Sequence, residues 1–179
     1  ERSEASYRRS YLDAQRNLYG WLAQHGQVPK QVVFVSSTGV YAQDDGRWVD
    51  EHSPTQPLRW SGRVMLEAEQ LAQASGIPCT LVRLAGIYGG QRQQFLRRVQ
   101  SGYHAQGSVN RYTNRIHEQD AISLLAHLLR QLASGVQLEA VYIGVDDCPI
   151  EQQEVVVWLQ QQLGVSGSED LRLGKPGSS

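Results

Sequence analysis

The spacing of apolar residues changes along the chain, and these changes predict an alternation of helices and strands. Apolar side chains recur at helical spacing from Tyr7 to Leu22, which predicts a helix that ends near Gly26. The continuous apolar run Val32–Val35 is typical of a strand buried on both faces of a sheet. By the same criteria we expect further helices at 59–75, 94–99, 120–133 and 151–163, and further strands at 80–84 and 140–143.

Strands that alternate with helices indicate a parallel sheet with right-handed crossovers and helices on both faces. A chain of 179 residues is enough for one domain with a single core. We therefore expect an α/β fold with a doubly wound parallel sheet, forming one domain over residues 1–179. The Gly/Ser-rich segment 164–179 is expected to be a flexible tail.

Charge and composition narrow the classes of partner. The 17 basic and 18 acidic residues nearly cancel, which argues against nucleic acid or an anionic membrane surface as a partner. No apolar run approaches the ~18 residues of a membrane span. Two cysteines are too few for a disulfide scaffold, and the five histidines lack zinc-ligand spacing. We expect a cytoplasmic protein with a small-molecule substrate and no metal. The alternative is an exported protein in which the two cysteines form one disulfide.

Two segments that could face a ligand follow two of the expected strands, and the first of them is polar. Ser36, Ser37, Thr38 and Gly39 come after the first strand, and 85–87 come after the second. Ligands of open α/β sheets bind beyond the carboxyl ends of the strands, so both segments should lie on one rim. Serine and glycine can also simply turn the chain after a strand, and composition alone favours that simpler interpretation.

Four segments together carry a family resemblance. They read Val-Val-Phe-Val-Ser-Ser-Thr-Gly-Val-Tyr (32–41), Trp-Val-Asp-Glu-His-Ser-Pro (48–54), Ser-Gly-Arg-Val-Met-Leu-Glu-Ala-Glu (61–69) and Leu-Val-Arg-Leu-Ala-Gly-Ile-Tyr-Gly (81–89). Over residues 4–163 the chain resembles the extended short-chain dehydrogenase/reductases, the NAD-dependent epimerase/dehydratase group. The resemblance implies a Rossmann-like fold without its first strands, the C-terminal two-thirds of an NAD(P)-binding protein. A small substrate-side portion would come from 41–58, 90–120 and 145–179.

The resemblance also assigns roles to individual residues. Ser37 would hydrogen-bond the reacting hydroxyl of the substrate, and the backbone from Ala85 to Ile87 would line the nicotinamide of NAD or NADP. Full cofactor binding would need the N-terminal segment with its glycine-rich loop. The complete set of implied roles is catalytic for Ser37 and Ser61, cofactor-binding for Ser36, Met65, Ala85, Gly86 and Ile87, and substrate-binding for Thr38, Gly39, Arg92 and Arg115.

The reactive pair of the family is replaced in this chain. The family motif is Tyr-x-x-x-Lys, and Ser61 and Met65 stand at its two reactive positions. Their i, i+4 spacing places both on one helix face, which we expect to line a polar cleft with Ser37. A serine hydroxyl is too weak an acid to replace the phenol, and a thioether carries no charge. Tyr41 and Tyr88 are the nearby phenols that could substitute.

Three weaker patterns remain open. Gly86, Gly89 and Gly90 follow a strand but lack the spacing of a dinucleotide loop. Asp120 is expected to be the N-cap of the helix 121–133. The third pattern is a group of five arginines, Arg92, Arg97, Arg98, Arg111 and Arg115. Their guanidinium groups could bind a phosphate or a carboxylate, but a solvated helix face explains them equally well.

These observations support a leading function and two alternatives. The leading hypothesis is an NAD(P)-binding epimerase/dehydratase-like protein that acts on a sugar nucleotide or similar polyol. The first alternative is a non-catalytic dinucleotide-binding sensor or partner-binding protein, which the missing Tyr/Lys pair favours. The second is a structural domain without a ligand. The sequence leaves open whether the protein is catalytic, which dinucleotide it prefers, and its oligomeric state, for which a homodimer is one candidate.

Overall fold

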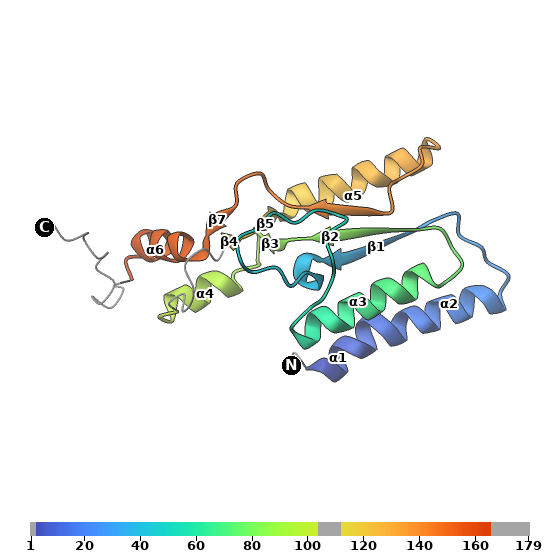
Figure 1. Ribbon diagram of the computed structural model, residues 1–179, viewed down its shortest axis with the longest axis horizontal. Helices are drawn as coiled ribbons and strands as arrows, with labels where there is room; N and C mark the ends of the chain where they lie inside the picture. Colours follow the sequence, from blue (N-terminus) through green and yellow to red (C-terminus); the bar gives the residue numbers. More distant parts are fainter. Residues whose placement is uncertain (1–2, 104–111, 166–179) are drawn as a thin grey trace, which may run out of the picture.

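A parallel three-stranded sheet forms the centre of the computed structural model, which describes residues 3–103 and 112–165 (Figure 1). Strands β1 (Val32–Ser37), β2 (Cys79–Leu84) and β6 (Val141–Gly144) lie in the order β1-β2-β6. Val32 stands opposite Cys79, and Leu81 stands opposite Val141. Parallel neighbours require crossover connections, and helices α3 (Trp60–Gln73) and α5 (Glu118–Ala133) lie within those connections. The predicted strand–helix alternation is confirmed.

Helices cover both faces of this sheet. Helices α2 (Ala14–Gln24) and α3 lie on one face, and α5 lies on the other (Figure 1). Neighbouring residues of β1 show the division, because Val33 packs with the α5 side and Phe34 with the α2–α3 side. The predicted doubly wound, Rossmann-like α/β fold is therefore confirmed. The two cores centre on Val82, Leu84, Ile116, Ala121 and Leu128, and on Leu12, Val64 and Ala68.

The first helix of the chain contains a wider turn. Helix α1 (Glu4–Arg8) continues through a π-helical segment, Arg9–Asp13, into α2. Gln15, just after this segment, donates through Nε2 to the carbonyl oxygens of Tyr11 (2.6 Å) and Ala68 (3.3 Å). The predicted helix that ends near Gly26 is confirmed, with the π-turn as an addition. Gln15 connects α2 to α3.

A smaller group of elements lies at one end of the sheet (Figure 1). Strand β3 (Gly86–Tyr88) pairs in parallel with β5 (Arg115–His117). Strand β4 (Tyr112–Thr113) pairs in antiparallel with β7 (Ile150–Glu151), beside helices α4 (Gln94–Gln100) and α6 (Gln152–Leu163). These short pairs are absent from the elements expected from the sequence, because runs of two or three residues carry no readable periodicity. Arg111 and residues 166–179 of the expected tail lie outside the described residues.

Two local expectations are wrong. Strand β1 is not buried on both faces, since Val35 is 41% exposed. Within the described sheet, β1 pairs only with β2, so it lacks the cover that buries β2 from Thr80 to Leu84.

The second correction concerns the start of α5. This helix begins at Glu118, and its N-cap is His117, whose Nδ1 accepts a hydrogen bond from the backbone N–H of Gln119 at 3.3 Å. Asp120 is not the cap but lies in the first turn. A carboxylate there interacts favourably with the positive end of the helix dipole, which accounts for its place in the sequence.

Candidate functional site

The carboxyl ends of β1 and β2 form a common rim. Ser37 stands opposite Leu84 in the strand register, so the segment after each strand starts at the same level. Ser37 Oγ accepts a hydrogen bond from the backbone N–H of Gly39 at 3.1 Å and caps the short 3-10 turn Thr38–Val40. Ala85 is buried at the end of β2, whereas Gly86 is exposed. The two strand ends thus meet as predicted, while their binding roles stay predictions.

Gly62 brings the start of α3 directly against this rim. A Cβ at Gly62 would collide with the carbonyl oxygen of Gly39 and lie 2.7 Å from Cβ of Pro57. Only glycine allows this approach, and it places the half-buried Ser61 beside the turn that follows β1. Gly62 is a site residue that the sequence reasoning missed. Its signal was a glycine inside an otherwise regular helical pattern.

Met65 lies one helical turn beyond Ser61. It is only 5% exposed, and its neighbours Val64 and Ala68 belong to the buried core. The expectation that both Ser61 and Met65 line an open polar cleft is therefore wrong for Met65. A thioether suits this apolar position, whereas an ammonium group would need a partner there.

A buried ion pair lies beneath the rim. Arg83, from β2, donates through Nε to Glu69 Oε1 (2.9 Å) and through Nη2 to Glu69 Oε2 (2.8 Å). Ser36 donates through its hydroxyl to Glu69 Oε1 at 2.6 Å. All three residues are buried. The Ser36 side chain is thus engaged in the interior, and its predicted contact with a cofactor is untested.

Tyr41 extends this network to the loop that follows β1. Arg83 Nη1 donates to the Tyr41 hydroxyl (2.7 Å), which in turn donates to the carbonyl oxygen of Asp50 (3.0 Å). Burial raises the pKa of the Tyr41 phenol, and Arg83 only partly opposes the shift. A phenol fixed in two hydrogen bonds with a raised pKa is poorly suited to move a proton near neutral pH. Tyr41 is better explained as an anchor for the loop.

Replacing Tyr41 by Phe is expected to lower the free energy of unfolding by about 1–2 kcal/mol, because a hydrogen bond to a charged group is lost. The pKa of the Tyr41 phenol is higher in the folded protein than in the unfolded chain. The neutral phenol therefore stabilises the folded state below about pH 10, and this contribution is lost as the pH rises through the pKa of the folded protein. Chemical denaturation at about pH 8 and about pH 11 should therefore give a smaller difference at the higher pH. An equal or larger difference there would contradict the assigned shift.

The paired strands β3 and β5 have one apolar and one polar face. Ile87 and Ile116 pack into the core on the α5 side. Partners in a register share a face and side chains alternate along a strand, so Gly86, Tyr88, Arg115 and His117 share the other face. The rings of Tyr88 and His117 lie 5.2 Å apart at 70°.

Arg115 occupies a different environment from the other predicted arginines. Its Cζ lies 4.4 Å from the centroid of the Phe95 ring, and burial lowers the pKa of its guanidinium. Arg92, Arg97 and Arg98 are exposed around α4. The structure therefore separates one half-buried arginine from a mainly solvated group.

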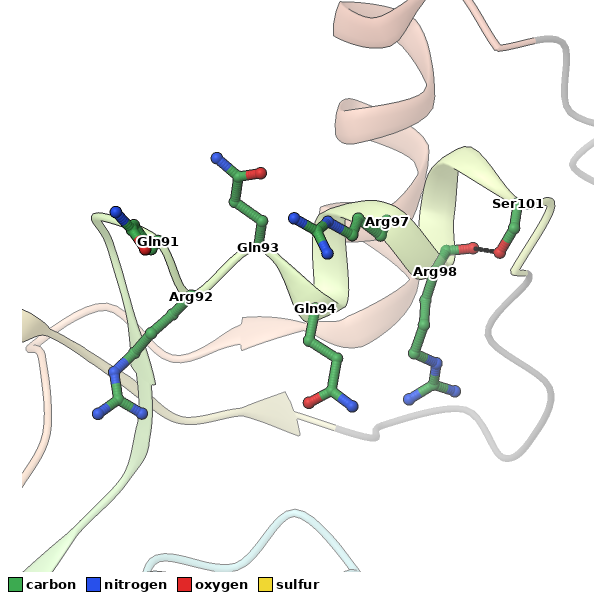
Figure 2. Close-up of a pocket in the computed structure, with 7 residues that line it drawn as sticks. All are labelled: Gln91, Arg92, Gln93, Gln94, Arg97, Arg98 and Ser101. Carbon is green, nitrogen blue, oxygen red and sulfur yellow. Dashed lines mark hydrogen bonds between the residues drawn. The ribbon is translucent and has the colours of Figure 1, made fainter. Parts of the chain in front are cut away.

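The exposed arginines line a shallow hollow of about 360 Å³ beside α4. Arg92, Gln94 and Arg98 extend to one side of the segment in Figure 2. Arg98 also lies 4.1 Å above the ring of Tyr103. The hollow is formed by one helix and the loop before it, from Gln91, Arg92, Gln93, Gln94, Arg97, Arg98 and Ser101. This arrangement favours a solvated helix face, and the substrate role of Arg92 stays a prediction.

The glycines after β3 have a packing explanation. Gly89 has φ of 113°, and a Cβ there would lie 2.6 Å from Nε2 of His117. Gly90 has φ of 49° and lies against the carboxylate of Glu118. Both glycines let the turn approach the start of α5, so their presence needs no phosphate ligand.

The described ranges 3–103 and 112–165 contain neither a metal-binding cluster nor a helix that could span a membrane. No group of three or more His, Cys, Asp or Glu side chains is placed to hold a metal ion. Of the helices in these ranges, none combines the length and the apolar character needed to cross a membrane.

Comparisons with known proteins identify the relatives of this arrangement. Residues 13–158 match the family model described as RmlD substrate binding domain. The chain is 33% identical to a solved structure described as an NAD-dependent epimerase/dehydratase from Methylobacillus flagellatus, with a TM-score of 0.74. It is 31% identical to a conserved protein of unknown function from Silicibacter pomeroyi DSS, with a TM-score of 0.66. It is 25% identical to MoeE5 in complex with UDP-glucuronic acid and NAD, with a TM-score of 0.68.

The matches cover most of this chain but only part of each relative. They span 98%, 87% and 86% of this chain in the order given above. They span 59%, 53% and 54% of the corresponding relatives. This chain thus has less than two thirds of the length of these relatives. No curated protein matches the sequence.

Proposed function

This chain belongs to the RmlD substrate binding domain family, and we propose from that premise that it binds NAD or NADP and acts on a sugar nucleotide or similar small polyol. Its relatives among solved structures include one protein described as an NAD-dependent epimerase/dehydratase and MoeE5 in complex with UDP-glucuronic acid and NAD. The observation that carries the proposal is the rim itself. There the turn that Ser37 caps packs against the start of α3, where Gly62 lies against Gly39.

The residues of the rim fit one end of a dinucleotide. Gly39 and Gly86 are exposed and have no side chain, so a flat ring can approach the backbone beyond the strand ends. Ser37 and Thr38 offer hydroxyl groups to a polar ligand. The pyrophosphate end would need a glycine loop with Gly-x-x-Gly-x-x-Gly spacing, which the 179-residue sequence does not contain. When bound, the dinucleotide would supply hydride transfer.

The proposed enzyme must transfer a proton, whereas the alternative, a dinucleotide-binding sensor, need not. In the proposed enzyme, Ser37 orients the reacting hydroxyl and Ser61 takes the place of the family's tyrosine. Ser61 has no neighbouring ammonium to strengthen it as an acid, because Met65 is apolar and buried. This observation favours the second candidate, a dinucleotide-binding sensor without turnover. Both free cysteines, Cys79 and Cys148, are compatible with the cytoplasmic location that we propose.

Calorimetric titration of the full-length protein with NAD and NADP tests the proposal, followed by turnover assays with UDP-sugars. We expect binding of one dinucleotide, and Ser37→Ala is expected to lower any turnover by about a hundred-fold or more, the usual effect of removing a donor at a reacting oxygen. Ser75→Ala is the matched control, because that hydroxyl bonds only near the end of α3. Binding without turnover would favour the sensor, and no binding of any dinucleotide or UDP-sugar would refute both.

A further inference from the structure

Tyr88 carries an exposed phenol at the end of β3, next to the rim. The residue is 42% exposed. Its ring contacts that of His117, but its hydroxyl group forms no hydrogen bond with any residue in the described part of the chain. The phenol of Tyr41, by contrast, is held by Arg83 and by the carbonyl oxygen of Asp50. Of these two phenols, only that of Tyr88 is open to a ligand.

The position of Tyr88 along β3 places it beside the backbone that we propose for the dinucleotide ring. Side chains alternate along a strand, so Tyr88 shares its face with Gly86, two residues and about 7 Å away. Ile87, between them, packs into the core on the other face. Because Gly86 has no side chain, a flat ring over its backbone would have the phenol of Tyr88 at its edge.

Arg115 supplies a positive charge on the same face. It stands opposite Gly86 in the register of β3 and β5, one step from the pair formed by Tyr88 and His117. Burial lowers the pKa of the Arg115 guanidinium, and the charges of Asp146 and Tyr88 partly oppose that shift. The phenol and the guanidinium are thus close enough to interact electrostatically. A negative charge that develops on Tyr88 would be stabilised by this neighbour.

We propose that Tyr88 is the catalytic residue that transfers the proton in the reaction proposed above, with Arg115 as its cationic neighbour. This inference rests on the proposed function and deepens it. The tyrosine and lysine of the family motif come from one helix, where this chain has Ser61 and Met65. Here the phenol and the cation come instead from the paired strands β3 and β5.

Tyr88 acts as an acid in one direction of the reaction and as a base in the other. In reduction, the O–H bond of Tyr88 breaks and its proton passes to the carbonyl oxygen of the substrate, while the carbonyl carbon receives a hydride from NADH or NADPH. The phenolate that remains is stabilised by the charge of Arg115 and regains a proton from water, which reaches the exposed ring. In oxidation, the phenolate takes the proton of the substrate hydroxyl while the hydride passes to NAD or NADP.

Tyr88→Phe in the full-length protein tests the role of the hydroxyl group. We expect turnover of UDP-glucose with NAD or NADP to fall by about a hundred-fold or more, the usual contribution of a general acid or base. The affinities for the dinucleotide and for UDP-glucose, measured by calorimetric titration, should stay unchanged, because the proton moves only in the transition state. Tyr142→Phe is the matched control, since the hydroxyl of Tyr142 accepts a hydrogen bond from the backbone N–H of Glu139, before the start of β6.

Substitutions at Arg115 test the role of its charge. Arg115→Gln should lower turnover by about ten-fold or more, as expected for the loss of an opposite charge close to an ionising group. Arg115→Lys keeps the charge and should retain more turnover than Arg115→Gln. Arg130→Gln, at the exposed end of α5, should leave turnover unchanged. Equal losses in the two Arg115 variants would overturn the role assigned to the charge.

Nitration of tyrosine gives a readout that does not depend on turnover. Tetranitromethane modifies accessible tyrosine rings, and mass spectrometry locates the product. Tyr112 is the matched control, because it is 46% exposed and lies in the separate strand pair β4–β7. NAD alone, at about ten times its Kd, should slow the nitration of Tyr88 by about ten-fold and leave that of Tyr112 unchanged.

Each outcome decides a different claim. Full turnover in Tyr88→Phe would overturn the catalytic role, and so would bound NAD that leaves the nitration of Tyr88 unchanged. The nitration measurement decides the matter on the unmodified protein even if Tyr88→Phe fails to fold. Dinucleotide binding without turnover in the unmodified protein would overturn the catalytic role and favour the sensor. An unmodified protein that binds neither dinucleotides nor UDP-glucose would refute the proposed function as well.

Discussion

Replacing Glu69 by Gln is expected to lower the free energy of unfolding by about 3–5 kcal/mol, the usual cost of breaking a buried ion pair from one side. The Glu69 and Arg83 side chains are 1% and 7% exposed, so water cannot take the place of the lost carboxylate. Arg83 would keep its charge in the interior with no compensating negative charge, and only the Gln amide oxygen and the Tyr41 hydroxyl would remain as acceptors. Urea denaturation of both proteins at neutral pH measures the difference.

Glu67 provides the control on the same helix. It pairs with Arg8 at 2.8 Å, but the two side chains are 40% and 42% exposed. Glu67→Gln should therefore cost less than about 1 kcal/mol, as surface ion pairs generally do. Equal effects at Glu67 and Glu69 would mean that the buried pair is not the main support beneath the rim.

Gly62→Ala is expected to destabilise the protein by about 1–3 kcal/mol, because the added methyl group overpacks a tight contact. It would meet the backbone of Gly39, which is less able to move aside than the end of a side chain. The turn after β1 should shift with it, so the same variant is expected to weaken ligand binding at the rim. Thermal unfolding and NAD(P) titration measure the two effects.

Gly20→Ala is the matched comparison in α2. No atom lies within 4 Å of a Cβ built there, and Gly20 is exposed within a regular helix. This substitution should stabilise the protein by about 0.5–1 kcal/mol, since alanine loses less conformational entropy in a helix. If Gly62→Ala were stabilising as well, the close approach of α3 to the rim would be wrong.

Periodicity predicted the long helices and strands because each helix buries a continuous stripe of apolar side chains and each strand buries a mainly apolar run. Val64 and Ala68 of α3 and Leu81, Val82 and Leu84 of β2 are apolar and buried as the pattern predicted, whereas Thr80 and Arg83 are buried polar residues in the same strand. Val35 was misjudged because an apolar run shows that a strand can be covered, not that a neighbour covers it. The start of α5 was misplaced because histidine is a less common N-cap than aspartate, so Asp120 was preferred to His117.

The sequence predicted where the candidate site lies, but it did not predict most of the side-chain contacts within the site. The strand-end rule placed Ser37 and Ala85 on one rim, because topology alone determines that relation. The engagement of Ser36 with Glu69 depends on a partner 33 positions away, which no local pattern shows. The backbone contact of Asp146 with Arg115 was missed for a similar reason, since it forms only where the segment after β6 meets β5.

The π-turn at Arg9–Asp13 shifts the direction in which side chains point before it relative to those after it. A π-turn holds one residue more than an α-turn, so the residues before it are rotated by about 100° relative to a continuous α-helix. This offset lets Tyr7 and Leu12 pack in one cluster against α3. An alignment that assumes a single helical repeat would therefore misassign the buried positions on one side of the turn. A gap of one residue is the natural difference to expect between relatives with and without it.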